Sequence, residues 1–257
     1  MKSELHSLRG KLLKYIRVLD ENLKLFQQHD VIVLGISGGY DSITLTDIIT
    51  QYNTQRRLSL KIYPVFVNNH FKPLLNEDKL RKLLQERGLE LTILEDAETE
   101  KNIKFKLKPF NPCFICSRER KKKLLEFAYT LKSNKVLLAH TLDDAIETLF
   151  LNILYSRGIS TIMPVQPLFQ GKFFIVRPFI FVEKSLVKKY ATLLGIDQKL
   201  EGECPYDRSS KRSFVREFLH ELYAKDPIVK NNIKHALFHC NEKFLWHQYI
   251  DLKELLL

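Results

Sequence analysis

The chain has 257 residues, of which 45% are apolar and 28% charged, and its formal net charge is +11. This length allows one large α/β domain, or one domain with helical additions. No apolar run is long enough to span a membrane, and residues 1–15 lack a signal-peptide core, so we expect a soluble, cytoplasmic protein with no membrane partner. Four cysteines are too few for a disulfide framework. The basic excess suits a polyanion such as nucleic acid, but also a solvated basic surface.

The elements expected along the chain alternate between helices and strands. Residues 3–26 have apolar side chains at helical spacing and predict an amphipathic helix. Helical patterns then separate five short β-rich runs, which are residues 31–36, 61–69, 89–95, 135–140 and 173–179. This alternation predicts a doubly wound, mainly parallel five-stranded sheet with helices on both faces. We divide the chain into an N-terminal helical segment, a core domain and a basic helical segment, which are residues 1–28, 29–200 and 201–257.

The stretch GISGGYDS, Gly35–Ser42, joins the first predicted strand to its helix. Backbone N–H groups of residues 37–39 can wrap around a phosphate oxyanion at such a turn. Asp41 would repel phosphate unless a Mg²⁺ lies between them, so the sequence predicts a magnesium ligand there. Ser42 can cap the helix or donate to a phosphate oxygen. An ordinary glycine turn is the alternative, but it leaves the SGG-x-DS order unexplained.

Two further polar stretches follow predicted strands, at Val67–His70 and His140–Asp144. In doubly wound sheets ligands bind at the carboxyl ends of strands, so these stretches are expected near the glycine turn. Asp143 and Asp144 open a helix and could simply interact with its dipole. They could instead handle ATP and Mg²⁺ opposite Asp41, and Asp144 is slightly favoured for that role.

Cys113 and Cys116 form a CxxC pair at the start of a predicted helix, and Cys204 stands alone further along. Zinc, iron–sulfur clusters and redox disulfides all use such pairs. Three thiolates with one open iron would suit a cluster that binds sulfide, while a catalytic zinc with three ligands stays open. The basic runs Arg118–Lys123 and Arg208–Arg216 flank these cysteines. They are either solvated faces or a means of drawing a tRNA backbone to the site.

The SGG-x-DS loop resembles the PP-loop of the ATP-pyrophosphatase superfamily, which splits ATP into AMP and pyrophosphate on an adenine nucleotide alpha-hydrolase-like fold. The ordered set of motifs is similar to the tRNA 2-thiocytidine synthase family: the loop, CxxC, His140–Asp144, Glu147-Thr148, Leu149–Asn152, Met163-Pro164 and Arg177-Pro178. The resemblance implies ATP-dependent adenylation of a base carbonyl oxygen in tRNA and its replacement by sulfur. It also implies a 4Fe–4S cluster on Cys113, Cys116 and Cys204, a sulfur donor such as a cysteine desulfurase, and allows a homodimer.

Two positions differ from the family pattern. Many members carry Lys where this chain has Tyr40, so the charge that neutralises phosphate has to come from elsewhere, with Arg120 and Arg177 as candidates. The later site usually has a second CxxC, where this chain has CPYD and places Asp207 at the second thiol position. Because a cluster with an open iron needs three thiolates, Cys204 is sufficient there.

The candidate catalytic residues are therefore Asp41, Asp144, Cys113, Cys116 and Cys204. The candidate residues for ATP are Ser37, Gly38, Gly39, Asp41, Ser42, Val67, His140 and Arg177. Two alternatives remain: a ligase like tRNA lysidine synthetase, which shares the loop but has no use for the cysteines, and a non-catalytic nucleic-acid-binding module. Another PP-loop sulfurtransferase, acting on uridine or a non-tRNA substrate, also fits.

Overall fold

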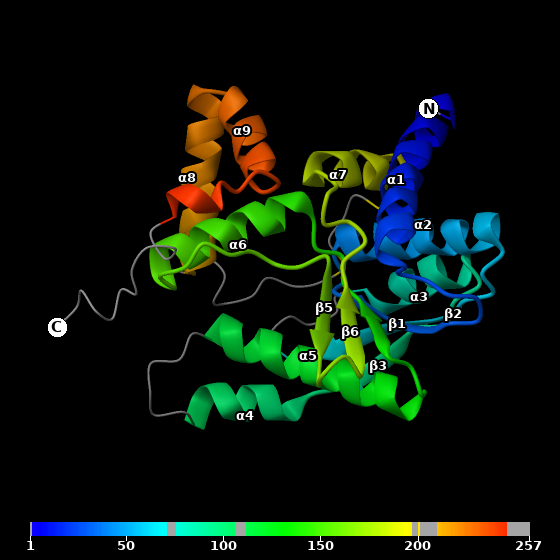
Figure 1. Cartoon of the computed structure of the whole chain (residues 1–257). Helices are drawn as coiled ribbons and strands as arrows, with labels where there is room; N and C mark the ends of the chain where they lie inside the picture. The colour runs from blue at the N-terminus through cyan, green and yellow to red at the C-terminus, as the bar shows by residue number, and fades with distance from the viewer. Residues whose placement is uncertain (1, 71–75, 106–111, 197–199, 201–209, 246–257) are drawn as a thin grey trace.

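The computed structural model describes residues 2–70, 76–105, 112–196, 200 and 210–245. In this part of the chain a six-stranded sheet has the order β3-β2-β1-β4-β6-β5, with helices on both faces (Figure 1). All neighbouring strands pair in parallel except β5 and β6, which are antiparallel. The doubly wound, mainly parallel α/β fold predicted from the sequence is confirmed.

The elements have the following bounds. The strands are β1 (Val31–Ile36), β2 (Lys61–Asn68), β3 (Thr92–Glu95), β4 (Lys135–Leu137), β5 (Val165–Leu168) and β6 (Phe173–Val176). The helices are α1 (Lys2–Leu23), α2 (Tyr40–Arg56), α3 (Glu77–Gln85), α4 (Ala97–Phe105), α5 (Pro112–Thr130), α6 (Leu142–Tyr155), α7 (Lys184–Leu193), α8 (Lys211–Lys225) and α9 (Ile228–Ala236), with a 3₁₀ turn η1 (Glu242–Phe244). None of these described helices is both long and apolar enough to cross a membrane.

The predicted number of five strands is wrong, because β5 was missed. It is four residues long and contains Pro167, which has no N–H to donate to a ladder, so the run carries no strand pattern. The sheet accepts this proline because β5 is the edge strand. The sequence also gave no prediction for α4, which lies between β3 and the CxxC helix.

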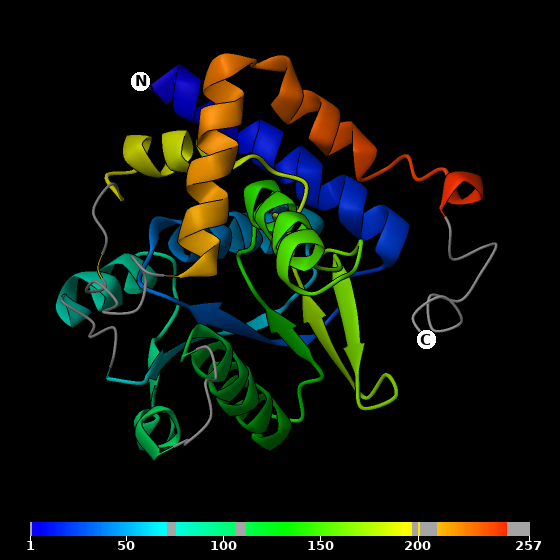
Figure 2. The same cartoon turned by 90° about the vertical axis from the view of Figure 1, so that its left-hand side faces the viewer.

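The two faces of the sheet have separate cores. Ile32 and Leu34 of β1 pack with helices α1, α2, α3 and α7, whereas Val33 packs with α5. Figures 1 and 2 show α4 and α5 on one side of the sheet and α1, α2, α6 and α7 on the other. Leu12 and Ile16 of α1 are fully buried in the larger core. The division of the chain at residues 28 and 200 stays a prediction.

Gly35, near the end of β1, allows α5 to approach the sheet closely. A Cβ at this position would lie 2.9 Å from Leu138 Cδ2 and 3.1 Å from Leu124 Cδ1. A larger residue would therefore push α5, and the thiols in its first turn, away from the strand that leads into the glycine loop.

Candidate active site

A cleft of about 510 Å³ lies where β1, β2, β4 and β6 end. Its lining brings together most of the predicted residues, which are Ser37, Asp41, Ser42, Val67, Cys113, Cys116, His140, Asp144 and Arg177. Gly38 and Gly39 continue the loop between Ser37 and α2, whereas Cys204 lies outside the described residues. Separate strand ends thus converge on one cavity, as expected for a doubly wound sheet.

The loop after β1 is shaped by its two serines and by Gly38. The Ser42 hydroxyl donates to the Gly39 carbonyl at 2.9 Å and accepts from the Ser37 N–H at 3.2 Å. Gly38 has a φ of 81°, which a residue with a side chain rarely adopts. Its carbonyl accepts a hydrogen bond from the Leu200 N–H at 2.9 Å. Gly39 provides no side-chain cap for α2, so the positive end of this helix faces the cleft as an anion site requires.

Asp41 follows the loop and has one oxygen in contact with a cation. Its Oδ2 lies 3.3 Å from Nζ of Lys184, the first residue of α7. Its Oδ1 is buried and has no hydrogen-bond partner in the described part of the chain. Burial raises the pKa of Asp41 to about 6, the charge of Lys184 opposes this shift, and the nearby charge of Asp144 adds to it. The carboxylate therefore has an oxygen and a charge available for a further cation.

Lys184 is the cation that the structure places at the loop. Besides contacting Asp41, its Nζ lies 6.0 Å from the ring centre of Tyr40, the loop position at which the resemblance led us to expect a lysine. Burial opposes its charge, but Asp41 and Asp144 outweigh burial and raise the pKa of Lys184. It was not predicted, because its position depends on packing between α7 and α2, which are far apart in the sequence.

Asp144 and Asp143 have different surroundings. Asp144 Oδ2 accepts from the N–H and hydroxyl of Thr141, at 2.8 and 2.9 Å, and the residue lines the cleft. Burial opposes its ionisation, but His140, Lys184 and the Thr141 N–H outweigh burial and lower the pKa of Asp144. Asp143 instead accepts from the Lys184 N–H at 2.7 Å and contacts Lys230 Nζ at 3.1 Å. Asp143 thus holds α7 and α9 in place, while Asp144 faces the cleft.

His140 and Arg177 are held in the cleft wall. The Nδ1 atom of His140 is buried without a hydrogen-bond partner in the described residues, and burial lowers its pKa to about 4. The imidazole is therefore neutral near pH 7. Arg177 is only 3% exposed and donates to Met163 O at 2.8 Å and Gln166 Oε1 at 2.9 Å. Burial lowers the pKa of Arg177 to about 10, which still leaves it a cation.

Cys113 and Cys116 occupy the first turns of α5, and both line the cleft. The side-chain amide of Asn69 donates to Cys116 Sγ at 2.9 Å, and Arg120 Nη2 lies 3.9 Å from the same sulfur. Two neighbouring thiols with donors directed at one of them fit ligation by thiolates. In the described part of the chain, no group of three or more His, Cys, Asp or Glu side chains is placed to hold a metal. The third predicted ligand, Cys204, lies outside the described residues.

Two cations of the cleft lining, Lys121 and Arg212, were expected only as members of the basic runs, and not as site residues. Arg212 of α8 places Nη1 3.8 Å from Asp144 Oδ1 and donates from Nη2 to Thr148 Oγ1 at 3.3 Å. Burial, with a contribution from Arg177, lowers the pKa of Lys121. Lys121 and Arg212 belong to the two basic runs, but helical phase and packing decide which member of each run faces the cleft.

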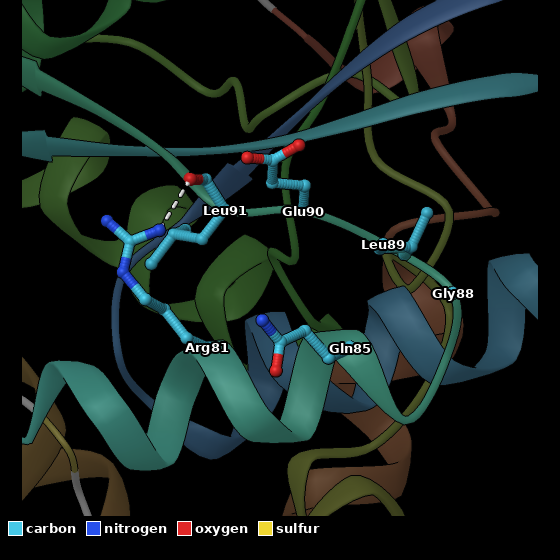
Figure 3. A pocket seen from close by; sticks show the side chains of 6 residues that line it. All are labelled: Arg81, Gln85, Gly88, Leu89, Glu90 and Leu91. Atoms are coloured by element: carbon cyan, nitrogen blue, oxygen red, sulfur yellow. Dashed lines mark hydrogen bonds between the residues drawn. The ribbon is translucent and has the colours of Figure 1, made fainter.

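A separate hollow lies where α3 passes into β3 (Figure 3). Arg81 crosses it and donates from Nη1 to the Leu91 carbonyl at 3.1 Å. The lining contains none of the predicted site residues. This hydrogen bond ties α3 to the start of the following strand, which is a structural role.

Known proteins with similar sequences carry names that fit an ATP site combined with thiols. Two curated relatives are named tRNA-cytidine(32) 2-sulfurtransferase. The protein from Anaeromyxobacter dehalogenans is 27% identical over 239 residues, which cover 92% of this chain and 81% of the relative. The protein from Acinetobacter baylyi is 29% identical over 238 residues, which cover 91% and 78%.

A similar solved structure is the U34-tRNA thiolase NcsA from Methanococcus maripaludis with its 4Fe–4S cluster. It superposes with a TM-score of 0.72 at 20% identity, covering 96% of this chain and 81% of the thiolase. At this identity the likeness establishes a shared fold. The family profile described as "PP-loop domain" matches residues 11–222. The family expected from the SGG-x-DS loop is confirmed, and the chain belongs to the PP-loop domain family.

Proposed function

We propose that this protein is an ATP-dependent tRNA sulfurtransferase that forms 2-thiocytidine. The observation that carries the proposal is that one cleft contains both the phosphate loop, with Asp41, and the thiols Cys113 and Cys116. A ligase that uses an amine as nucleophile has no role for these thiols. The relatives named tRNA-cytidine(32) 2-sulfurtransferase, matched along most of their length, support the same reaction.

The loop and α2 would bind the ATP phosphates. The N–H groups of Ser37 and Gly39 and the hydroxyl of Ser42 now donate within the loop, so each would exchange its present hydrogen bond for one to a phosphate oxygen when ATP binds. The positive end of α2 would add to the attraction for phosphate. Lys184 would neutralise phosphate charge, which the uncharged Tyr40 cannot do, because the Lys184 Nζ already lies beside the loop. Asp41 fits a Mg²⁺ ligand, since Oδ1 is a buried oxygen without a partner in the described residues. Bound Mg²⁺ would neutralise charge on the phosphates.

Two bond exchanges give the product. The carbonyl oxygen of the base bonds to the α-phosphorus of ATP, and pyrophosphate leaves. A sulfur nucleophile then bonds to the base carbon that carries this oxygen. The carbon–oxygen bond breaks, and AMP leaves with the oxygen. Lys184 and Arg212 are the cations placed to stabilise charge near Asp41 and Asp144 during these steps. Neutral His140 is able to donate or accept a hydrogen bond, but it carries no charge.

Cys113, Cys116 and Cys204 would hold a 4Fe–4S cluster. When bound, such a cluster supplies an iron site that presents sulfide as a nucleophile. Asn69 and Arg120 would direct hydrogen bonds at Cys116 and so favour its thiolate form. We also place the enzyme in the cytoplasm with its tRNA, where it receives sulfur from a donor protein such as a cysteine desulfurase. The proposal is compatible with a homodimer and does not require one.

The test is a reaction of anaerobically purified protein with ATP, Mg²⁺, sulfide and unmodified tRNA transcript. Mass spectrometry of the digested tRNA should reveal 2-thiocytidine, with pyrophosphate and AMP released in equal amounts. Iron, acid-labile sulfide and zinc are measured in the same protein and in a Cys204→Ala variant. About four irons with matching sulfide per chain, lost in the variant, are expected.

Other outcomes would redirect the assignment. Thiolated uridine in place of cytidine would change the substrate. In a parallel reaction with lysine in place of sulfide, lysine attached to the base would indicate a lysidine-type ligase. Stoichiometric zinc without iron would replace the cluster with a zinc site. No pyrophosphate release with tRNA present would leave a non-catalytic binding protein.

A further inference from the structure

A second groove lies beside the active-site cleft, on the α5 face of the sheet. Helix α5 packs over β1, β2 and β4, while β6 and β5 extend the sheet beyond it. The groove between α5 and this hairpin has a volume of about 680 Å³, and its apolar lining includes Leu125, Leu168, Phe173 and Ile175. None of the roles proposed above uses this groove.

Two exposed aromatic side chains line the groove, one on each side. Tyr129 of α5 is 74% exposed, and Phe169, which follows β5, is 66% exposed. Phe169 also contacts Phe173 in an edge-to-face arrangement with ring centres 6.0 Å apart. Exposed aromatics on opposite sides of an apolar groove suit a flat, unsaturated ring as the ligand.

The backbone at Phe169 is strained. The turn is closed by a hydrogen bond from Gly171 N–H to Leu168 O at 3.1 Å. Its central residues, Phe169 and Gln170, have φ values of 50° and 59°. Hairpin turns with two positive φ values favour Asn and Gly, and a bulky residue there is unfavourable. The chain thus holds a phenyl ring at a position where a small residue would be more stable, which points to a use for the ring.

The groove is also basic and shares a wall with the cleft. Arg118, Lys121 and Lys122 line it beside Glu126. Arg118 also pairs with Glu119 at 2.6 Å and Lys122 with Glu126 at 3.8 Å, so phosphates would share these two cations with carboxylates. Lys121 lines both the groove and the cleft. Gln166 of the groove accepts a hydrogen bond from Arg177 of the cleft at 2.9 Å. The end of the groove formed by Lys121 and Gln166 therefore adjoins the cleft.

We propose that this groove binds an unstacked nucleobase of the same tRNA whose target base is held in the cleft. This inference rests on the proposed function. The base stacks between Tyr129 and Phe169 over the apolar floor, and the phosphates that flank it contact Arg118, Lys121 and Lys122. Proteins recognise single-stranded RNA loops by this combination of aromatic stacking and cations along the backbone. The charge of the rim and the shared wall favour RNA over an apolar protein segment.

The experiment measures tRNA affinity by filter binding and thiolation by mass spectrometry, for wild-type protein and three variants. Tyr129→Ala and Phe169→Asn remove the two rings, while Phe244→Ala is the matched control, since Phe244 is 79% exposed on η1 and does not line the groove. Each groove variant should weaken tRNA binding roughly 5- to 100-fold, as loss of one stacked base predicts. ATP affinity should stay unchanged, and the control should bind tRNA like wild type.

Phe169→Asn also separates binding from folding. Asn tolerates a positive φ, so the melting temperature of the Phe169→Asn variant should equal or exceed that of wild type, while its tRNA affinity falls. If wild type binds and thiolates tRNA but the groove variants match the control, this inference is wrong and the proposed function stands. If wild type neither binds nor thiolates tRNA, the proposed function fails. Unchanged tRNA affinity with a shift in sedimentation mass would identify a second copy of the chain as the occupant and overturn the inference.

Discussion

Lys184 Nζ lies 3.3 Å from Asp41 Oδ2, so the first residue of α7 supplies the positive charge beside the first turn of α2. A hydrogen bond from the Lys184 backbone N–H to Asp143 fixes the start of α7 against the start of α6. Three helix N-termini are thereby tied together around one acidic cluster.

Replacing Lys184 with Ala should raise the KM for ATP roughly ten- to hundred-fold, the size expected for loss of a charge-assisted hydrogen bond. Steady-state pyrophosphate release in the presence of tRNA measures this effect. Lys188→Ala is the matched control, because Lys188 lies exposed on the same helix. Lys184→Arg should recover part of the affinity. An unchanged KM in Lys184→Ala would assign neutralisation of the phosphates to another cation, such as Arg120.

Asp41→Asn should abolish activity yet stabilise the fold at neutral pH. Burial raises the pKa of Asp41 from 3.8 to about 6, so the folded state retains a proton that the unfolded state has lost. The stability that Asp41 contributes is thus present below pH 3.8 and is lost as the pH rises through 6. Two pKa units correspond to about 3 kcal/mol.

Urea unfolding without Mg²⁺ or nucleotide, between pH 4.5 and 8, tests this linkage. The free energy of unfolding of Asp41→Asn, relative to wild type, should increase by about 1–3 kcal/mol across that range. A difference that does not vary with pH would mean that Asp41 ionises as easily in the folded as in the unfolded chain.

His140 should remain neutral between pH 8 and 5. Burial lowers its pKa from 6.5 to about 4, so its imidazole resonances should not shift in an NMR titration over that range. His140→Gln identifies those resonances by their loss. As the pH falls, His140 takes up its proton near pH 6.5 in the unfolded chain but only near pH 4 in the folded one. The stability that neutral His140 contributes is therefore complete above pH 6.5. It falls by about 3 kcal/mol as the pH drops to 4. A midpoint near 6.5 would contradict this environment.

Two glycines should respond oppositely to replacement by Ala. At Gly35 a Cβ would press on Leu138 and Leu124, so Gly35→Ala should destabilise the protein by about 1–3 kcal/mol. Gly10 lies exposed in α1 with nothing within 4 Å of a Cβ, so Gly10→Ala should stabilise by about 0.5–1 kcal/mol. Thermal unfolding of both variants is the measurement. If Gly35→Ala stabilised the protein as much as Gly10→Ala, the side chains packed on Gly35 would be able to shift at no cost in stability.

The elements that depend on neighbouring residues in the chain could be predicted from the sequence. The strand, glycine loop and helix of residues 31–56 follow from an apolar run, two glycines and a helical pattern, and the structure has all three. The meeting of Asp41 with Cys113 and Cys116 followed from the general rule that the strands of such sheets end at one edge. β5 was missed because Pro167 and its four-residue length remove any periodicity.

Other site residues depend on packing that the sequence does not display. Lys184 reaches Asp41 because α7 lies against α2, and Arg212 reaches Asp144 because α8 lies against α6. Nothing in the residues around Lys184 or Arg212 distinguishes them from other basic residues nearby. Only the three-dimensional arrangement selects them.

The hydrogen bond from Leu200 to the Gly38 carbonyl links the phosphate loop to a distant part of the chain. Leu200 is buried in the main core, and it stands four positions before Cys204 in the sequence. The conformation of the glycine loop is therefore held in part by Leu200, which lies far beyond β1 and α2 in the sequence.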